Sequence, residues 1–314
     1  MNLDSTRQPA SRRKVLAWGT GVALATALPM SGSAHASAPD GDSGAGGAIA
    51  RRLRELERRH SARLGVHARD TATGRTVRYR ADERFPMCSL FKPLAVAAVL
   101  RDLDRDGEFL AERIRYTEED VTDSGYAPVT GEPGNLASGM TVAELCAAAV
   151  SHSDNTAGNL LLRELGGPAA VTRFCRSVGD RTTRLDRWEP ELNSAEPWRM
   201  TDTTTPYAVG RTYARLTLGT ALAPEDRERL TGWLLANTTG DAKLRAGLPS
   251  DWTVAEKTAG GKYGTNHDVG IVRPPGRAPL VMAVLTTKRE PDAAPDNPLI
   301  AETAALLAGA LTRQ

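Results

Sequence analysis

The sequence predicts an α/β fold of the α+β kind, in which a five-stranded antiparallel sheet is flanked by terminal helices and an all-helical part is inserted. Three observations lead to this prediction. Strand-like segments occur near the two ends of the chain, the region between them has helical periodicity, and one further helical segment stands at each end. Strands from the two ends would pair antiparallel into one sheet. A cleft beside the inserted part is then the expected place for a site.

Local patterns place the outer elements. Residues 49–60 have apolar side chains at helical spacing, and residues 64–70 and 76–80 flank Thr73-Gly74 as the two strands of a hairpin. Three strands and a final helix are predicted near the other end: 253–257, 267–273, 280–288 and 297–311. The α/β part of the catalytic unit, residues 48–314, is therefore expected to comprise about 48–86 and 237–314.

The middle of the chain, about residues 87–236, is expected to be the inserted helical part. Thr141 and Glu144 form a capping box at the start of one helix, in which each side chain satisfies a backbone donor of the other residue. Apolar residues at helical spacing predict six helices: 94–103, 141–151, 157–165, 168–178, 205–218 and 224–236.

The N-terminus, residues 1–36, has the pattern of an export signal. It contains the twin-arginine pair Arg12-Arg13, an apolar stretch (15–28) too short to span a membrane, and the cleavage pattern Ala-His-Ala at 34–36. A retained membrane anchor is the alternative. We expect secretion by the twin-arginine route, with no integral membrane span after cleavage. The mature chain then begins with a flexible lead-in at 37–47.

Composition excludes several classes of partner. The chain of 314 residues has 40 Lys and Arg against 38 Asp and Glu, and this balance indicates neither nucleic acid nor an anionic membrane surface as a partner. Three cysteines, Cys88, Cys146 and Cys175, are an odd number for an exported protein. We expect free thiols, with Cys88 as a small, half-buried residue, because no His stands in a plausible base motif to activate it.

Ser89 and Lys92 form a Ser-x-x-Lys pattern, which places a hydroxyl and an amine on one face of a helix. Ser89 is predicted to be a nucleophile near a helix start, where free N–H groups favour a developing anion. Lys92 can accept its proton if burial and neighbouring cations lower the pKa of the amine. Pro93 predicts a distorted first turn. Such a tetrapeptide occurs about once by chance in a chain of this size, so the other motifs decide its meaning.

Ser153-Asp154-Asn155 falls in a loop between two predicted helices. Ser153 can relay a proton to a leaving nitrogen, and the Asn155 amide can hold a substrate amide. Asp154 is expected to bond the backbone of its own loop. The triplet can also cap the helix that follows, and both roles can hold at once.

Lys257 and Thr258 end a predicted strand and run into glycines. The lysine offers a cation and the threonine a hydroxyl, which together suit a substrate carboxylate. The N–H of Gly260 can pair with that of Ser89 as an oxyanion hole. The alternative is a strand end followed by a loose turn.

Residues 187–193 form a long irregular segment, and long loops in compact domains are commonly functional. Glu189 and Asn193 can hold one water between them, with Glu189 as general base. Arg187 is expected to pair with Asp202 and so to pin the two ends of the loop.

In this combination and order, the motifs resemble those of the class A serine β-lactamases. The resemblance extends to segments 126–130, 140–142, 154–157 and 237–240, and covers the chain from about Ile49 onward. It implies a monomeric, exported hydrolase that opens the β-lactam ring of penicillin- and cephalosporin-type antibiotics. The reaction would proceed through an acyl-serine intermediate, confer antibiotic resistance and need no metal or organic cofactor.

The resemblance also implies roles for individual residues. The catalytic residues would be Ser89 as nucleophile, Lys92 and Glu189 in proton transfer, and Ser153 as donor to the ring nitrogen. Glu189, in a cis peptide bond with Pro190, would drive deacylation by water. The substrate-binding residues implied are Tyr126 at the cleft mouth, Asn155, Asn193, Lys243, Lys257, Thr258 and Gly260.

The sequence departs from the family pattern at four positions. Ala259 replaces the glycine of the third motif, which puts the turnover rate in question, and Gly260 lacks a hydroxyl that many members have there. No arginine follows this strand at the position where some members bind the substrate carboxylate, and Lys243 is expected to take that part. Gly261 stands where some carbapenem-hydrolysing members have a cysteine bonded to the equivalent of Cys88, so that disulfide is not available.

Two other functions remain as alternatives. A penicillin-binding D,D-peptidase shares the first three motifs but lacks a deacylating glutamate such as Glu189. A catalytically impaired β-lactam-binding protein is supported only by Ala259.

Overall fold

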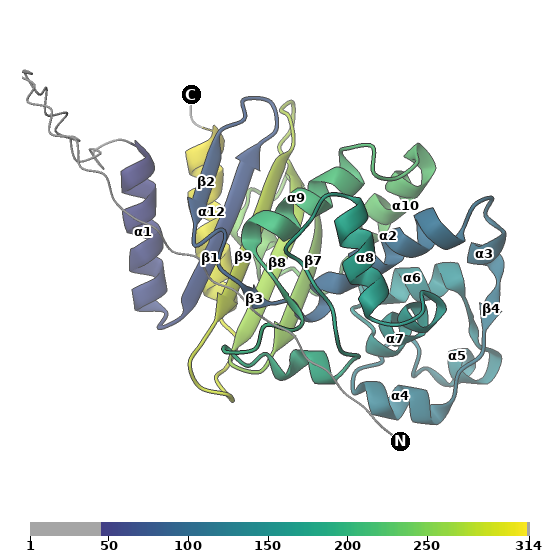
Figure 1. The fold of residues 1–314 in the computed structure, drawn as a ribbon. Coiled ribbons are helices and arrows are strands. Elements are labelled where there is room, and N and C mark those ends of the chain that lie inside the picture. Colours follow the sequence, from purple (N-terminus) through teal and green to yellow (C-terminus); the bar gives the residue numbers. More distant parts are fainter. Residues whose placement is uncertain (1–44, 313–314) are drawn as a thin grey trace, which may run out of the picture. The chain divides into compact units, whose positions relative to one another are not determined.

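A five-stranded antiparallel sheet runs through the part of the chain that the computed structural model describes, residues 45–312, and helices cover both of its faces (Figure 1). The strand order is β2-β1-β9-β8-β7. The strands are β1 (Arg63–Asp70), β2 (Thr76–Tyr79), β7 (Thr253–Gly261), β8 (Thr265–Arg273) and β9 (Leu280–Thr287). Because β1 pairs with β9 along its whole length, the beginning and end of the described chain share one sheet. The predicted sheet is confirmed.

Alternation along the strands divides the apolar residues into two cores. In β9, Leu280, Met282 and Val284 face a core shared with the terminal helices α1 (Ala45–Arg59) and α12 (Asn297–Thr312). Val281 and Leu285 face the second core, which continues into the helical part. Both faces of β9 are thus buried, as expected for a central strand covered on both sides.

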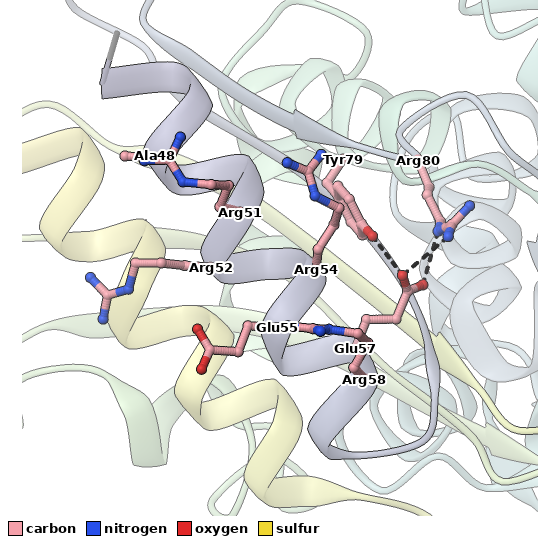
Figure 2. A pocket seen from close by; sticks show the side chains of 9 residues that line it. All are labelled: Ala48, Arg51, Arg52, Arg54, Glu55, Glu57, Arg58, Tyr79 and Arg80. Atoms are coloured by element: carbon pink, nitrogen blue, oxygen red, sulfur yellow. Dashed lines mark hydrogen bonds and ion pairs between the residues drawn. The ribbon is translucent and has the colours of Figure 1, made fainter. Parts of the chain in front are cut away.

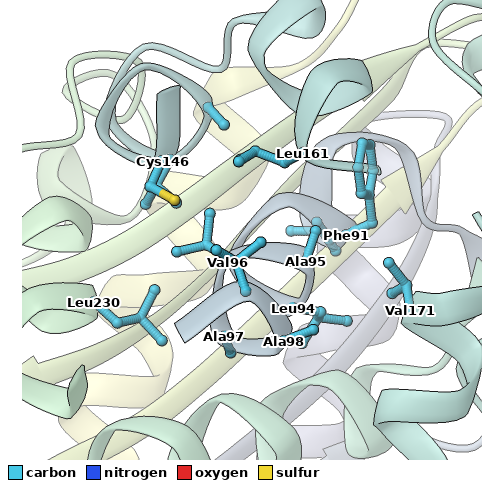
Figure 3. Packing of buried hydrophobic residues seen from close by; sticks show 14 of the residues in the cluster. Phe91, Leu94, Ala95, Val96, Ala97, Ala98, Cys146, Leu161, Val171 and Leu230 are labelled. Carbon is cyan, nitrogen blue, oxygen red and sulfur yellow. The ribbon is translucent and has the colours of Figure 1, made fainter. Parts of the chain in front are cut away.

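The second core surrounds α2 (Lys92–Ala98), all seven residues of which are buried, and the helices around it enclose its apolar side chains (Figure 3). A 3₁₀ turn, η1 (Cys88–Phe91), precedes α2, and a π-helical turn, η2 (Val99–Leu103), follows it. The distorted start predicted from Pro93 is therefore present. Four of the predicted helices follow as α6 (Val142–Ser151), α7 (Asn155–Glu164), α8 (Ala169–Ser177) and α9 (Pro206–Thr217), and the last is α10 (Pro224–Leu235). The capping box of Thr141 and Glu144 is confirmed.

Helix α1 is held to the hairpin by the carboxylate of Glu57. This group accepts hydrogen bonds from the Tyr79 hydroxyl and from the Arg80 guanidinium, which lie together beside the arginine-rich face of the helix (Figure 2). The helix begins at Ala45, four residues before the predicted start, because the small residues before Ile49 continue the helical turn and Gly47 is buried. The last three residues of the predicted lead-in are thus helical. The rest of the lead-in and the predicted export signal lie outside the described residues.

Short elements differ most from the prediction. Helices α3 (Glu108–Ala111), α4 (Glu118–Ser124), α5 (Pro133–Ser138) and α11 (Leu244–Gly247) are too short to produce a clear apolar period. Two-residue strands form two small sheets, β3 (Phe85–Pro86) with β6 (Thr203–Thr204) and β4 (Arg113–Ile114) with β5 (Met140–Thr141). Within residues 45–312, no helix combines the length and apolar character that a membrane span requires.

His267 gives the fold a dependence on pH. The ring is fully buried, its Nδ1 accepts a hydrogen bond from the Thr286 N–H (3.1 Å), and its Nε2 therefore donates to the Pro86 carbonyl (2.8 Å). Burial lowers the pKa of His267 to about 4, from an ordinary 6.5. Between these values the unfolded chain binds a proton that the folded protein does not. The resulting stabilisation, about 3 kcal/mol, is present above pH 6.5 and is lost as the pH falls towards 4.

We therefore expect His267→Gln to flatten the pH dependence of stability. Urea unfolding at about pH 7 and about pH 4.5 measures the change in free energy of unfolding for each protein. The loss on acidification should be smaller in the variant by about 2 kcal/mol. Equal losses in the variant and the wild type would contradict this assignment.

Candidate active site

Ser89 lies in the 3₁₀ turn that leads into α2, one turn before Lys92, as the motif predicts. The preceding Cys88 has a φ of 43°, a left-handed conformation that is uncommon for a residue other than glycine. Such backbone strain tends to persist at functional sites, where the surrounding structure holds it. Ser89 is 6% exposed and Lys92 is completely buried. Ser89 is therefore held by the backbone in a largely buried position.

The Lys92 amine is the centre of the site. Its Nζ lies 3.0 Å from Ser89 Oγ, 2.6 Å from Asn155 Oδ1 and 3.1 Å from Glu189 Oε1, and it also donates to the Ser153 carbonyl (2.7 Å). Burial lowers the pKa of Lys92, and the Glu189 carboxylate opposes this shift. One amine thus joins three segments of the chain, and its position permits proton exchange with both the serine and the glutamate.

Ser153 stands between two lysines. Its hydroxyl accepts a hydrogen bond from Lys257 Nζ (2.9 Å) and lies 3.5 Å from Lys92 Nζ. Ser153 has a φ of 59°, so its loop, like the turn at Ser89, has a left-handed residue beside the lysines. The hydroxyl thus lies within reach of both amines.

Asp154, the next residue, holds this loop in place through hydrogen bonds to its carboxylate. Its fully buried carboxylate caps α7 through the Ala157 N–H (2.9 Å), as one of the two alternatives predicts. Asp154 was also expected to bind the backbone of its own loop, and this prediction is wrong. The carboxylate accepts the N–H groups of Val129 and Thr130, in the loop between α4 and α5, rather than those of its own loop. Asp154 therefore ties the motif to a neighbouring segment.

Lys257 and Thr258 lie within β7, which continues through Gly261 rather than ending at Lys257 as predicted. The strand continues because β8 supplies partners as far as Thr265. Lys257 is completely buried, and burial together with the charges of Lys92 and Lys243 lowers its pKa well below the ordinary value. The Thr258 hydroxyl hydrogen-bonds that of Thr239.

Lys243 lies in the segment before α11, half-buried, with its Nζ 3.5 Å from the His267 carbonyl oxygen. Burial lowers the pKa of Lys243, and the carboxyl groups of Asp268 and Glu256 oppose the shift. Together with Lys92 and Lys257 it gives the site three amines in a poorly hydrated region. Such an arrangement attracts an anionic substrate more strongly than it would in water.

The glycine-rich end of β7 packs against the nucleophile turn. Gly260 is exposed on this edge strand, and a Cβ built there would lie 3.6 Å from the Thr265 carbonyl oxygen, an ordinary van der Waals contact. A Cβ on Gly261 would lie 2.9 Å from Cys88 Sγ and 2.8 Å from the Asn193 carbonyl, so only glycine fits there. Ala259, 3% exposed, is accommodated within the second core, which also includes Cys88.

All three cysteines are free and buried, and burial raises the pKa of each thiol. Cys88 was expected to be half-buried, but it is completely buried because the close approach of Gly261 covers its sulfur. Its raised pKa disfavours the thiolate, which agrees with the prediction that it is not a nucleophile.

Glu189 lies in the irregular segment that follows Arg187. Asn193 donates to its Oε2, and Asn193 Oδ1 remains a buried acceptor with no hydrogen bond in the described structure. The Glu189–Pro190 peptide bond is cis, as the resemblance implies. Asn159 of α7, which sequence analysis missed, holds the main chain of Glu189 through two hydrogen bonds (2.9 and 3.0 Å). Its place four residues after Asn155, on the same helix face, was the available signal.

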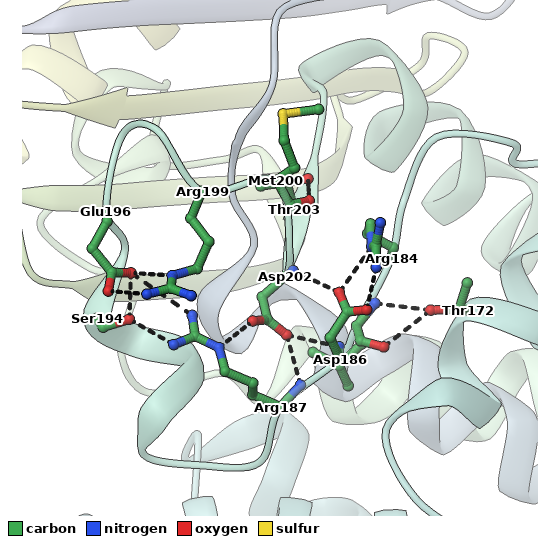
Figure 4. A network of polar contacts seen from close by, with 11 residues as sticks. Thr172, Arg184, Asp186, Arg187, Ser194, Glu196, Arg199, Met200, Asp202 and Thr203 are labelled. Carbon is green, nitrogen blue, oxygen red and sulfur yellow. Dashed lines mark hydrogen bonds and ion pairs between the residues drawn. The ribbon is translucent and has the colours of Figure 1, made fainter.

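The ends of this loop are joined by ion pairs. Arg187 Nε donates to Asp202 Oδ2 (2.6 Å), as predicted, and its Nη1 donates to Ser194 Oγ (2.9 Å) (Figure 4). Around this pair, Asp186 and Glu196 each bind a further arginine. The network explains how a loop with little regular structure keeps Glu189 within reach of Lys92.

Tyr126, 49% exposed, is joined to these residues by its main chain, where its carbonyl accepts the Asn155 N–H (2.8 Å). The Asn155 side chain is further oriented by the carbonyl of Ser124 (2.9 Å), a partner that sequence analysis did not identify. Seven predicted residues are linked by direct contacts: Ser89, Lys92, Ser153, Asn155, Glu189, Asn193 and Lys257.

Comparison with known proteins agrees with this geometry. A family model described as the beta-lactamase enzyme family matches residues 48–311. The chain belongs to this family. A β-lactamase of Streptomyces lavendulae is 67% identical over 309 residues, covering 98% of this chain and 100% of that protein. A β-lactamase of Streptomyces fradiae is 64% identical, covering 99% and 100% respectively.

Solved structures of other β-lactamases are also similar to this β-lactamase. The β-lactamase from Streptomyces albus G has a TM-score of 0.83 at 65% identity, covering 84% of this chain and 99% of that one. A structure described as an ancestral class A β-lactamase has a TM-score of 0.79 at 54% identity, covering 84% and 100%. The class A serine β-lactamase family and the hydrolase class predicted from the motifs are therefore confirmed.

Proposed function

We propose that this β-lactamase hydrolyses penicillin- and cephalosporin-type antibiotics through an acyl ester on Ser89, with deacylation by a water that Glu189 activates. The observation that carries this proposal is the position of Lys92 Nζ, within 3.1 Å of both Ser89 Oγ and Glu189 Oε1. A single buried amine that contacts both the nucleophile and a carboxylate provides a route for the serine proton.

Acylation begins when Ser89 Oγ attacks the β-lactam carbonyl and its proton passes to Lys92, which shares it with Glu189. The N–H groups of Ser89 and Gly260 are the proposed oxyanion hole, since Gly260 is exposed on the edge strand of the sheet. As the C–N bond of the ring breaks, the nitrogen takes the proton of Ser153, and Ser153 regains a proton from Lys92, whose Nζ lies 3.5 Å from its Oγ. Lys257, 2.9 Å from that hydroxyl, is placed to support the transfer.

Deacylation uses the opposite side of the site. Glu189 removes a proton from water, the resulting hydroxide attacks the ester, and Ser89 recovers its proton as the ring-opened acid leaves. Asn193 is proposed to hold the same water, because its amide donates to Glu189 while Oδ1 remains available as an acceptor. This second step distinguishes a hydrolase from a D,D-peptidase that stays acylated.

Lys257, Thr258 and Lys243 are proposed to bind the substrate carboxylate, with Asn155 on the acylamide side chain and Tyr126 at the mouth of the cleft. Burial, followed by repulsion from Lys92 and Lys243, lowers the pKa of Lys257, and a bound carboxylate would offset that repulsion. Binding of the substrate carboxylate would therefore favour the protonated form of Lys257.

Lys243→Gln tests the carboxylate contact. We expect KM for penicillins to rise about tenfold with little change in kcat, because the interaction exists in both ground and transition states. Lys262→Gln is the matched control, since Lys262 is exposed and pairs with Asp292. A fall in kcat with unchanged KM would instead assign Lys243 to the chemical step.

We also propose that the enzyme is exported by the twin-arginine route and acts as a secreted monomer without a metal or organic cofactor. Arg12-Arg13 and the Ala-His-Ala pattern ending at Ala36 support the export route. The mass of the mature enzyme should correspond to cleavage after Ala36. Replacement of the arginine pair by lysines should retain the precursor in the cell.

The function is tested by mixing the purified mature enzyme with a chromogenic cephalosporin and with a penicillin, while hydrolysis and protein mass are followed together. Fast turnover with a transient adduct is expected, and Ser89→Ala should abolish both signals. A stable adduct without turnover would overturn the hydrolase assignment and leave a penicillin-binding protein, or an enzyme impaired at Ala259.

A further inference from the structure

Helix α9 packs across β1 and β9 (Figure 1). Residues of these three elements line a cavity of about 570 Å³, and none of the residues proposed for catalysis is among them. Its volume is in the range of small-molecule sites. Basic side chains form one wall, and apolar side chains such as Leu218 and Val281 form another. The basic residues are His67, Arg69, Arg211 and Arg215. Among the described residues, no Asp or Glu lines the cavity.

The three arginines of this cavity are not neutralised by carboxylates within residues 45–312. Arg69 makes neither an ion pair nor a hydrogen bond there through its side chain. Arg211 donates to the Tyr207 hydroxyl (2.6 Å), and Arg215 donates to the Val178 carbonyl, so both have neutral partners. Elsewhere on the described surface, arginines commonly pair with acids, as Arg63 does with Glu83. The cavity therefore concentrates positive charge that an anion could balance.

His67 provides an independent indication of a ligand. Its side chain is 3% exposed, and its Nδ1 is buried without a hydrogen-bond partner in the described structure. Its ring packs edge-on against Tyr207, with 5.1 Å between centroids. Burial, followed by the charges of Arg78, Arg69 and Arg211, lowers the pKa of His67 to about 4. Unpaired buried polar atoms are rare, and those that occur often mark a place for water, an ion or a ligand.

We propose that this cavity binds a small organic anion, a monocarboxylate with an apolar body. Arg69 and Arg211, from facing elements, hold the carboxylate beside His67, and guanidinium groups suit such an anion because they can donate two parallel hydrogen bonds. The apolar body packs on Leu218 and Val281. The proposal does not depend on the hydrolytic mechanism, since the two sites share no lining residue.

NMR of the His67 imidazole tests this directly, because the chain has 5 His and a His67→Gln variant identifies the signal. Benzoate is the probe, benzamide is its neutral counterpart, and inorganic phosphate is an anion without an apolar body. We expect benzoate to shift the His67 signals saturably and to raise its pKa. Benzamide should have no effect, and phosphate should bind more weakly.

Arg69→Gln and Arg211→Gln are each expected to weaken benzoate binding about tenfold or more. Arg173→Gln, at an exposed arginine of α8, is the matched control and should leave the affinity unchanged. Arg69 and Arg211 are exposed residues, so each variant should fold, and thermal unfolding checks this. An absent benzoate response, an equal response to benzamide, tighter binding of phosphate, or unchanged affinity in both arginine variants would overturn the proposal.

Discussion

Glu189→Gln is expected to stop this β-lactamase after acylation. The amide retains the shape of the side chain and can still contact Asn193, but it cannot take a proton from water. Removal of a general base typically costs about 10²- to 10⁴-fold in rate, so we expect kcat for a penicillin to fall by about 10³-fold. Rapid mixing followed by mass spectrometry should show a penicilloyl adduct on Ser89 that accumulates and persists.

The glutamate also affects acylation through Lys92. Its carboxylate, 3.1 Å from Lys92 Nζ, raises a pKa that burial lowers. Without this charge the pKa of Lys92 falls further, and the amine is neutral over a wider range of pH. The acylation rate of Glu189→Gln should therefore reach its plateau at lower pH than that of the wild type, which separates the role of the lysine from that of the glutamate.

Glu191→Gln is the matched control, since Glu191 is exposed in the same loop and undergoes the same chemical change. It should retain wild-type kcat and form no lasting adduct. If Glu189→Gln turned over at the wild-type rate, or if Glu191→Gln trapped the same adduct, Glu189 would not be the deacylating base.

The sheet and the long helices can be predicted from sequence because their signals are local and repeated. The hairpin around Thr73-Gly74, the capping box at Thr141 and the apolar run of β9 each depend on a few neighbouring residues. The end of β7 cannot be located in this way. Its last residues are glycines, which favour a turn locally, and they remain in the strand because β8 pairs with them.

The active site shows the same difference between contacts that are local in sequence and contacts that are distant. Ser89 and Lys92 are brought together by helix geometry alone, and Arg187 with Asp202 by a plausible charge pair. The contacts of Lys92 with residues 153, 155 and 189 join positions distant in sequence, which spacing does not relate. The resemblance implied only that Lys92 and Glu189 share proton transfer. Asn159 was missed because its role is to hold the main chain of another segment, and such a role leaves little trace in a motif.

Asp154→Asn is expected to be the most destabilising single substitution near the site. The carboxylate is completely buried, and its Oδ2 accepts N–H groups from Val129 (3.0 Å) and Thr130 (2.9 Å) while Oδ1 caps α7. An asparagine presents an NH₂ group to one of these sets of donors and leaves at least one buried amide unpaired. Hydrogen bonds to charged groups contribute about 1.5 to 3 kcal/mol each. We expect the free energy of unfolding to fall by about 3 to 5 kcal/mol.

Chemical denaturation followed by circular dichroism measures this loss, with Asp123→Asn as the matched control because Asp123 is exposed on the nearby α4. Thr130→Val removes only one hydroxyl donor (2.8 Å from Asp154 Oδ1) and should cost about 1 kcal/mol. It therefore remains measurable if Asp154→Asn does not fold. A loss in Asp154→Asn no larger than in Asp123→Asn would mean that the loop at Ser153 is held by other contacts. The expected order, Asp154→Asn well above Thr130→Val and Asp123→Asn near zero, follows from the number of buried donors that each change leaves unpaired.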